Sequence, residues 1–68
     1  MTIFQERLRS CRKQAGLTQE QMAAELQIVF RSYRRYESGE TEPTLSSLVK
    51  MADYFNVSLD YLAGRTEK

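Results

Sequence analysis

Apolar residues recur along this chain at the spacing of amphipathic helices, and glycine, proline and small polar residues separate the runs. The first run ends at Gly16, where the periodicity is interrupted. Its apolar residues share one helical face: Phe4, Leu8, Cys11 and Ala15. Thr2, followed three residues later by Gln5, has the pattern of a capping box. The pattern therefore predicts a first helix that buries this stripe, with Cys11 as a small core residue.

Four further segments have helical character: "QEQMAAEL", the arginine-rich "VFRSYRRYESG", "LSSLVKMADYF" and "LDYLA". Three residues are placed to cap them: Thr18, which forms a capping box with Gln21, and then Thr44 and Ser58. In the fourth segment a broad apolar stripe is expected: Leu45, Leu48, Val49, Met51, Ala52 and Phe55. No segment alternates apolar and polar residues as a half-buried strand does. The sequence therefore predicts a compact all-α bundle of five short helices.

The arginine-rich segment has two chemically different faces. With Val29 at zero and about 100° per residue, Tyr33 and Tyr36 fall within about 40° of it on one face. Three arginines occupy the opposite face: Arg31, Arg34 and Arg35. Phe30 lies on the flank beside them. The tyrosines can therefore be buried while all three guanidinium groups project outward together.

Two interpretations of this arginine face are open. A polar helix face is most often solvated, and Arg34 would then pair with Glu37 three residues later. A solubilising face usually mixes charges and includes lysine, whereas here the only other polar residue is Ser32. The guanidinium fork matches phosphates and the O6/N7 edge of guanine, and an exposed Phe30 suits a thymine methyl group. The composition of this face therefore favours DNA.

Composition narrows the classes of function further. The 68 residues include a single cysteine, Cys11, and no histidine, so neither a disulfide nor a zinc or cysteine-based site is expected. Carboxylates are scattered without an acid–base pair, and we therefore expect neither an enzyme nor a cofactor. Charge appears by the sixth position, with no apolar run of the roughly 20 residues that a membrane span needs. We expect a cytoplasmic domain.

The net charge of +1 is distributed unevenly. Seven basic and four acidic residues up to Ser38 give +3, whereas three basic and five acidic residues from Gly39 onward give −2. Such asymmetry favours one face suited to a polyanion. In the first helix, Arg7, Arg9 and Lys13 are expected to be solvated, with Arg9 or Lys13 near enough to touch a DNA backbone.

The stretches "LTQEQMAAELQIVFRSYRRYESG" and "TEPTLSSLVKMADYFNVSLDYLAG" resemble the Xre/Cro-type helix-turn-helix repressors of phages and bacteria. The resemblance covers about Leu8 to Gly64 and includes the "LTQE" start, the "YESG" close and the "VSLDYL" end. It implies a lambda-repressor-like DNA-binding domain over residues 1–68, with the helix-turn-helix at about 19–38. Residues 19–26 would form its second helix and residues 30–38 its recognition helix.

The resemblance also implies roles for individual residues. Base-reading positions fall on Phe30, Arg31 and Arg35, with Arg34 and Val29 at the margin. Contacts to the DNA backbone fall on Thr18, Gln19, Ser32 and Ser38. Arg12 and Glu37 match a pair that often forms a buried salt bridge between the first and third helices, so these two are expected to be structural.

Four features depart from the family pattern. Gln27 stands where glycine is usual, so either its φ is positive and strained or the turn differs slightly. Val29 replaces the usual Ser or Thr and leaves the third helix without a side-chain cap. Tyr33 replaces a smaller residue, and its hydroxyl needs a partner. Glu40 and Glu42 stand where relatives often have lysine. These carboxylates would weaken the affinity for DNA.

The sequence therefore predicts a sequence-specific DNA-binding regulator, a repressor that binds a palindromic operator as a homodimer. Four apolar or aromatic residues in the C-terminal helices exceed what a short final helix must bury: Tyr54, Leu59, Tyr61 and Leu62. Burial in the core is the favoured role for them, and one or two would instead form a dimer patch. The alternative is a small antitoxin or anti-regulator that mainly binds another protein. Binding to a membrane surface is disfavoured, because the tyrosine face of the third helix is committed to the core.

Overall fold

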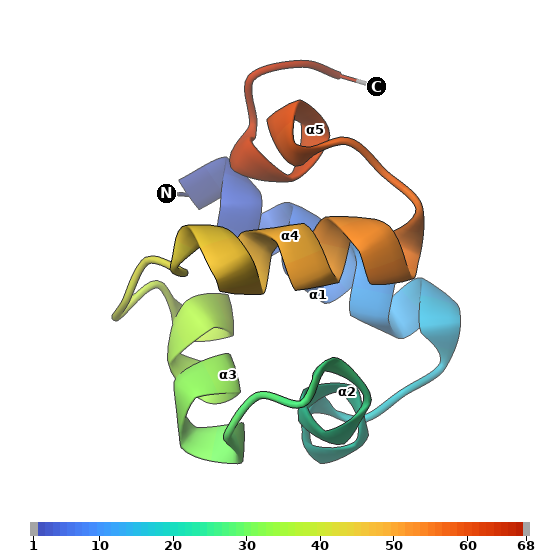
Figure 1. The fold of residues 1–68 in the computed structure, drawn as a ribbon, viewed down its shortest axis with the longest axis vertical. Coiled ribbons are helices and arrows are strands. Elements are labelled where there is room, and N and C mark those ends of the chain that lie inside the picture. Colours follow the sequence, from blue (N-terminus) through green and yellow to red (C-terminus); the bar gives the residue numbers. More distant parts are fainter. Residues whose placement is uncertain (1, 68) are drawn as a thin grey trace.

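A computed structural model describes residues 2–67, with side chains from Ile3 onward, and has no strand within that range (Figure 1). Its helices are α1 (Thr2–Ala15), α2 (Gln19–Leu26), α3 (Phe30–Ser38), α4 (Leu45–Phe55) and α5 (Leu59–Ala63). The predicted all-α fold and the five helical segments are confirmed. The capping role expected of Thr2 lies outside the described side chains. No helix in residues 2–67 has both the length and the apolar character needed to cross a bilayer.

The helices begin where the sequence supplies capping groups. The hydroxyls of Thr18, Thr44 and Ser58 each accept a backbone N–H from the first turn of the following helix. Before α2 the box is reciprocal, because Oε1 of Gln21 accepts the N–H of Thr18 at 2.9 Å. Val29 provides no side-chain hydrogen bond to α3, as predicted. These caps satisfy N–H groups that have no partner within a helix.

The core lies where the five helices meet. In Figure 1, α2 and α3 form one end of the molecule, α5 lies beside the start of α1 at the other, and α4 packs against α2 and α5. The side chains that are buried in this core are Phe4, Leu8, Met22, Ala23, Leu26, Tyr33, Tyr36, Met51, Ala52 and Leu62. A chain of this size relies on such a compact centre, because small domains bury a limited fraction of their surface.

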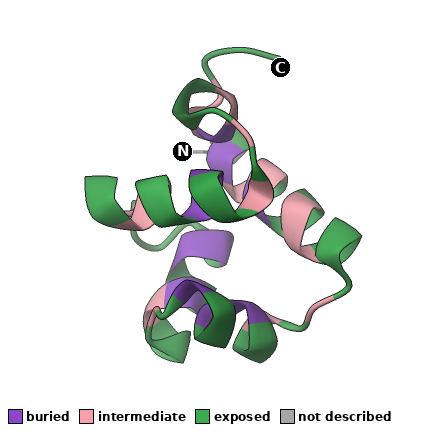
Figure 2. Cartoon of the chain, turned by 45° about the vertical axis from the view of Figure 1, so that its right-hand side comes forward, coloured by how far each residue is buried: buried purple, intermediate pink, exposed green. Residues whose placement is uncertain are grey.

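The edges of two predicted apolar stripes are exposed. Cys11 is only half-buried and Ala15 is exposed, so the stripe of α1 is buried at Phe4 and Leu8 but not at its end. Leu45 and Val49 are also exposed, and the first turn of α4, which begins at Leu45, extends beyond the other helices (Figure 2). Helical periodicity identifies a face of a helix, but it does not indicate how far the neighbouring helices extend along it.

Arg7 is not solvated, so the prediction for this residue is wrong. Its guanidinium carbon lies 4.2 Å from the ring centroid of Tyr61 in α5. Its Nη1 atom donates to the backbone carbonyls of Tyr61 and Thr66. A guanidinium group combines several donors with a planar cation that stacks on aromatic rings. Arg7 therefore ties α1 to the C-terminal part of the described chain.

Candidate nucleic-acid interface

The first component of the site is the turn between α2 and α3. α2 ends at Gln27, which has φ 57° and ψ 42°. The N–H of Gln27 donates to the carbonyl of Ala24 at 3.1 Å, and the N–H of Ile28 donates to that of Ala23 at 2.9 Å. Ala23 is buried, and its small side chain allows α3 to approach α2 closely. The left-handed turn at Gln27 therefore redirects the chain so that α3 crosses α2 as a helix-turn-helix.

Replacing Gln27 with glycine is expected to stabilise the domain. A left-handed conformation costs a residue with a Cβ about 1–2 kcal/mol, and the greater backbone entropy of unfolded glycine offsets about half of the gain. We expect a rise of about 0.5–1 kcal/mol in the free energy of unfolding, measured by urea denaturation. Asn56→Gly is the matched comparison, because Asn56 also has φ 57° but asparagine tolerates this region better. A less stable Gln27→Gly variant would contradict this account of the turn.

α3 places its tyrosines and arginines on opposite sides. Tyr33 and Tyr36 are buried in the core, whereas the side chains at positions 31, 34 and 35 are exposed. Phe30 is 38% exposed, and the guanidinium carbon of Arg34 lies 5.6 Å from the centroid of its ring. The buried tyrosines hold α3 against the other helices while its arginines face solvent.

Two side chains of the α3 segment differ from what helical spacing alone suggests. Val29 falls beside the tyrosines at a spacing of 100° per residue, but it is 72% exposed. Its φ of −57° and ψ of 134° place it before the first helical residue, so the 100° spacing does not extend to it. The pairing of Arg34 with Glu37 does not form either, because Glu37 turns inward to the core and contacts Arg12.

A buried hydrogen-bonded network joins α1, α2 and α3 around Glu37. Arg12 Nε donates to Glu37 Oε2 at 2.6 Å, and Arg12 Nη2 donates to Oε1 at 3.3 Å. The Tyr33 hydroxyl donates to Oε2, and Gln19 Nε2 donates to Oε1 at 3.1 Å. Glu37 is 3% exposed and Arg12 is 13% exposed. Arg12 Nη1 also donates to the carbonyl of Leu17 at 3.0 Å. The two residues that the resemblance pairs are therefore in direct contact.

Charges and hydrogen bonds in this network set the protonation of its members. Burial alone would raise the pKa of Glu37, but hydrogen bonds from Arg12, Tyr33 and Gln19, with the charge of Arg12, outweigh burial and lower it. Burial, followed by the hydrogen bond and charge of Glu37, raises the pKa of Tyr33. The hydrogen bond with Glu37 likewise raises the pKa of Arg12. At neutral pH the network therefore contains a carboxylate, a guanidinium and a neutral phenol.

The lowered pKa of Glu37 predicts a loss of stability in acid. Because its folded-state pKa lies below the ordinary value of 4.5, the ionised carboxylate stabilises the fold above that value. This contribution is lost as the pH falls through the folded-state pKa. We expect the free energy of unfolding in urea to fall more steeply between about pH 5 and pH 2 in the wild-type chain than in Glu37→Gln. Parallel curves would show that Glu37 titrates normally.

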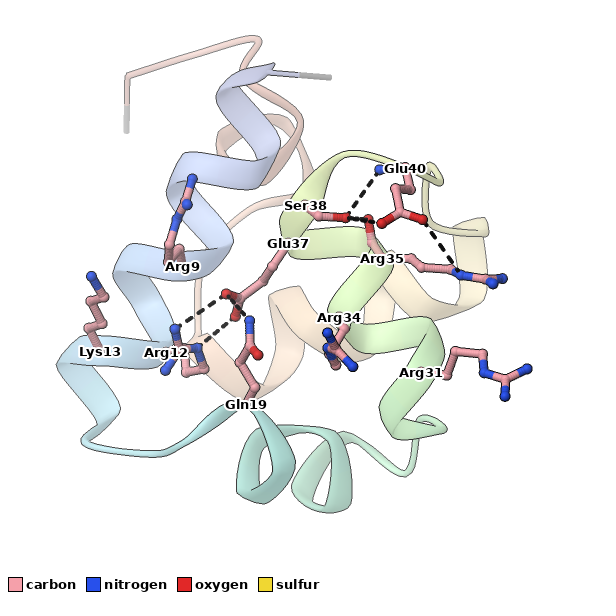
Figure 3. Close-up of a pocket in the computed structure, with 10 residues that line it drawn as sticks. All are labelled: Arg9, Arg12, Lys13, Gln19, Arg31, Arg34, Arg35, Glu37, Ser38 and Glu40. Atoms are coloured by element: carbon pink, nitrogen blue, oxygen red, sulfur yellow. Dashed lines mark hydrogen bonds and ion pairs between the residues drawn. The ribbon is translucent and has the colours of Figure 1, made fainter.

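A cleft of about 510 Å³ opens between α1 and α3 beside this network (Figure 3). Its basic lining residues are Arg9, Arg12, Lys13, Arg31, Arg34 and Arg35. Its carboxylates, Glu37 and Glu40, are each paired with an arginine. The cleft therefore has an excess of positive charge, contributed by two helices. Arg9 or Lys13 was expected near a DNA backbone, but their position beside the α3 arginines was not predicted, because helical periodicity gives no information on how two helices pack.

Glu40 lies beside one of the predicted base-reading residues. Its Oε2 atom is 3.9 Å from Nε of Arg35, and both side chains are exposed. Ser38 Oγ donates to the carbonyl of Arg35 and lies 3.3 Å from Glu40 Oε1. The carboxylate is therefore held near Arg35, where an approaching phosphate or base would compete with it.

The residues predicted to contact the DNA backbone have different surroundings. Thr18 is exposed, and its hydroxyl accepts the N–H of Gln21. Gln19 is half-buried and donates to Glu37. Ser32 is half-buried on α3, and Ser38 is exposed at the C-terminal end of α3. Thr18 and Ser38 are therefore open to solvent, whereas Gln19 is already part of the buried network.

These features define a helix-turn-helix domain: α2 is capped, a left-handed turn follows it, and α3 is anchored with a basic outer face. A model of the helix-turn-helix family matches residues 8–62. The chain belongs to this family, in its Xre/Cro type.

Several curated proteins are similar in sequence. The cryptic phage CTXphi transcriptional repressor RstR of Vibrio cholerae is 51% identical over 62 residues, covering 91% of this chain and 55% of RstR. The uncharacterized HTH-type transcriptional regulator YqaE of Bacillus subtilis is 45% identical over 60 residues, covering 88% of this chain and 52% of YqaE. The SPbeta prophage-derived uncharacterized HTH-type transcriptional regulator YonR of Bacillus subtilis is 42% identical over 60 residues, covering 88% of this chain and 56% of YonR.

The chain spans about half the length of these curated relatives. No solved structure matches this chain.

Proposed function

We propose that this chain is a sequence-specific DNA-binding domain of a transcriptional regulator, and that it represses by occupying an operator. The observation that carries the proposal is the outer face of α3. Three exposed arginines and a partly exposed Phe30 project from a helix that buried Tyr33 and Tyr36 hold in place. In helix-turn-helix proteins the second helix of the motif enters the major groove. A relative named as a phage transcriptional repressor supports the same role.

Within the groove, Arg31 and Arg35 would each donate two hydrogen bonds to a guanine. Arginine is the most common reader of the O6/N7 edge, because its fork matches the two acceptors. Phe30 would contact the methyl group of a thymine, the apolar feature of the major-groove edge. Arg34, which stacks over Phe30, would hold that ring and contribute at the margin of the site.

Backbone contacts would fix the register of α3 on the duplex. Thr18 and Ser38 present exposed hydroxyls, which suit phosphate oxygens. Gln19 lies in the first turn of α2, where backbone N–H groups favour an anion. Ser32 would support these contacts from the flank of α3. Such contacts position the protein and contain no sequence information themselves.

We also propose that the domain binds as a homodimer to a palindromic site. Two recognition helices would then enter successive major grooves, about 34 Å apart. Tyr54 of α4 and Leu59 of α5 are partly exposed apolar side chains in the C-terminal helices and would contribute to the dimer contact. We place the protein in the cytoplasm. Binding DNA in this way involves no chemical reaction and no cofactor.

A selection from a random duplex library at physiological salt tests the proposal, because affinity for DNA depends strongly on salt concentration. We expect enrichment of a two-fold symmetric sequence with half-sites one helical turn apart. A single enriched half-site would retain sequence-specific recognition but overturn the homodimer. The absence of any enriched motif would overturn sequence-specific binding and favour the alternative, an antitoxin or anti-regulator that acts by binding a protein.

A further inference from the structure

We infer that Arg9 and Lys13 of α1 form a second DNA-contacting surface, which binds phosphates of the strand bordering the groove that α3 enters. The inference rests on the proposed function and extends the interface to a helix outside the helix-turn-helix motif. It assigns a sequence-independent part of the affinity to α1, whereas the proposed reading of bases belongs to α3.

The basic residues of α1 divide into two groups by their contacts. Arg7 is engaged by Tyr61 and by backbone carbonyls, and Arg12 is engaged by Glu37. Arg9 and Lys13 are exposed and form no ion pair with the described residues. They are one turn apart, within about 40° of each other around the helix axis. A pair of unneutralised cations therefore projects from one face of α1.

This face adjoins the arginines of α3. Figure 3 shows Arg9 and Lys13 on α1 and Arg34 on α3 at opposite sides of the cleft, with the paired Arg12 and Glu37 between them. The cleft carboxylates already have arginine partners. Basic side chains of both α1 and α3 therefore line one cleft, as a surface that binds a polyanion requires.

Glu6 is the nearest acidic residue on the same helix, and it borders an adjoining hollow with Arg9 and Lys13. It forms no ion pair with either of them among the described residues. The two cations are therefore not committed to neutralising a neighbouring carboxylate.

The dimensions of DNA fit this arrangement. Packed helices have axes about 8–10 Å apart, and α1 is joined to α3 through the pair of Arg12 and Glu37. The major groove is about 12 Å wide. With α3 in the groove, a helix packed beside it lies above one of the two phosphate backbones that border the groove. Long side chains on the exposed face of α1 can then extend to the phosphates.

The test compares the salt dependence of DNA binding in two double variants. Arg9→Gln with Lys13→Gln removes the proposed contacts. Lys50→Gln with Arg65→Gln removes the same net charge from exposed residues outside the cleft. The probe is a mixed-sequence duplex two helical turns long, and binding is measured by fluorescence anisotropy over a series of salt concentrations.

We expect the cleft variant to lower the slope of log K against log salt by about 1.8 for each bound subunit, because each phosphate contact contributes about 0.9. The loss of affinity between 50 and 200 mM salt would then be about twelve-fold smaller than in the wild-type chain. The control variant should retain a slope close to that of the wild-type chain. The cleft variant should also weaken binding to the selected operator by the same factor as binding to mixed-sequence DNA.

The outcomes separate this inference from the proposed function. If the wild-type chain binds DNA and both variants have equal slopes, Arg9 and Lys13 do not contact phosphates, and the inference is overturned alone. If the wild-type chain binds no duplex at low salt, the proposed function fails and the inference fails with it. If the cleft variant weakens operator binding more than mixed-sequence binding, the two residues read sequence, which also overturns the inference.

Discussion

Replacing Arg12 with alanine is expected to destabilise the domain by about 3–5 kcal/mol, because the change leaves a buried carboxylate without its cation. Glu37 is 3% exposed and would retain only the hydrogen bonds from Tyr33 and Gln19. A chain of this length is stable by roughly 3–10 kcal/mol, at 0.05–0.15 kcal/mol per residue. Urea denaturation at neutral pH should therefore show a domain that is close to, or beyond, the limit of stability.

A matched control distinguishes the effect of losing a buried ion pair from the effect of losing any ion pair. Arg65→Ala breaks the exposed pair of Arg65 and Asp60, 3.7 Å apart, and should cost less than about 1 kcal/mol. The loss in the free energy of unfolding caused by Arg12→Ala should also become smaller as the pH falls, because protonation removes the uncompensated charge of Glu37. Equal losses in the two variants would show that Tyr33 and Gln19 alone satisfy Glu37.

The second large effect is expected on DNA recognition. Arg35→Ala should weaken binding to the selected operator by roughly 5- to 150-fold for each half-site, which corresponds to the 1–3 kcal/mol of one bidentate guanine contact. The preference for guanine should be lost at one base pair in each half-site. Competition binding with operator variants measures both effects, and Arg31→Ala should relax a different base pair.

Lysine at the same position provides the sharper comparison. Arg35→Lys retains the charge but not the planar fork, so we expect discrimination at that base pair to fall while affinity for mixed-sequence DNA is retained. Lys50→Ala, at an exposed position outside the cleft, is the control for a change of net charge. An equal loss on all sequences in Arg35→Ala would show that Arg35 binds phosphate and reads no base.

Much of the local structure follows from residues close in sequence. The helix starts at Thr18, Thr44 and Ser58 were predictable, because capping depends on a side chain and an N–H group three residues later. The strained turn at Gln27 and the uncapped start of α3 after Val29 were also predictable, since the family resemblance identifies which residue types are usual there. The predicted burial of Tyr33 is confirmed as well.

Contacts between helices were predicted less well. The pattern assigned Arg7 to solvent, yet it stacks on Tyr61, and it placed Leu45 on a buried stripe although α4 extends beyond the core there. These outcomes depend on the relative position of residues far apart in the chain, to which helical periodicity is insensitive. A partner for the Tyr33 hydroxyl was expected, but its identity was not.

The sequence by itself determined the five helices, their caps and the division of α3 into a tyrosine face and an arginine face. Each depends on residue type and on spacing within one or two turns, which a helix converts directly into geometry. Only the tertiary structure decided that Glu37 turns inward to Arg12, that Glu40 lies beside Arg35, and that Arg9 and Lys13 adjoin the α3 arginines. Those relations exist because packing of the core fixes the angles and distances between helices, and these are set by contacts distributed over the whole chain.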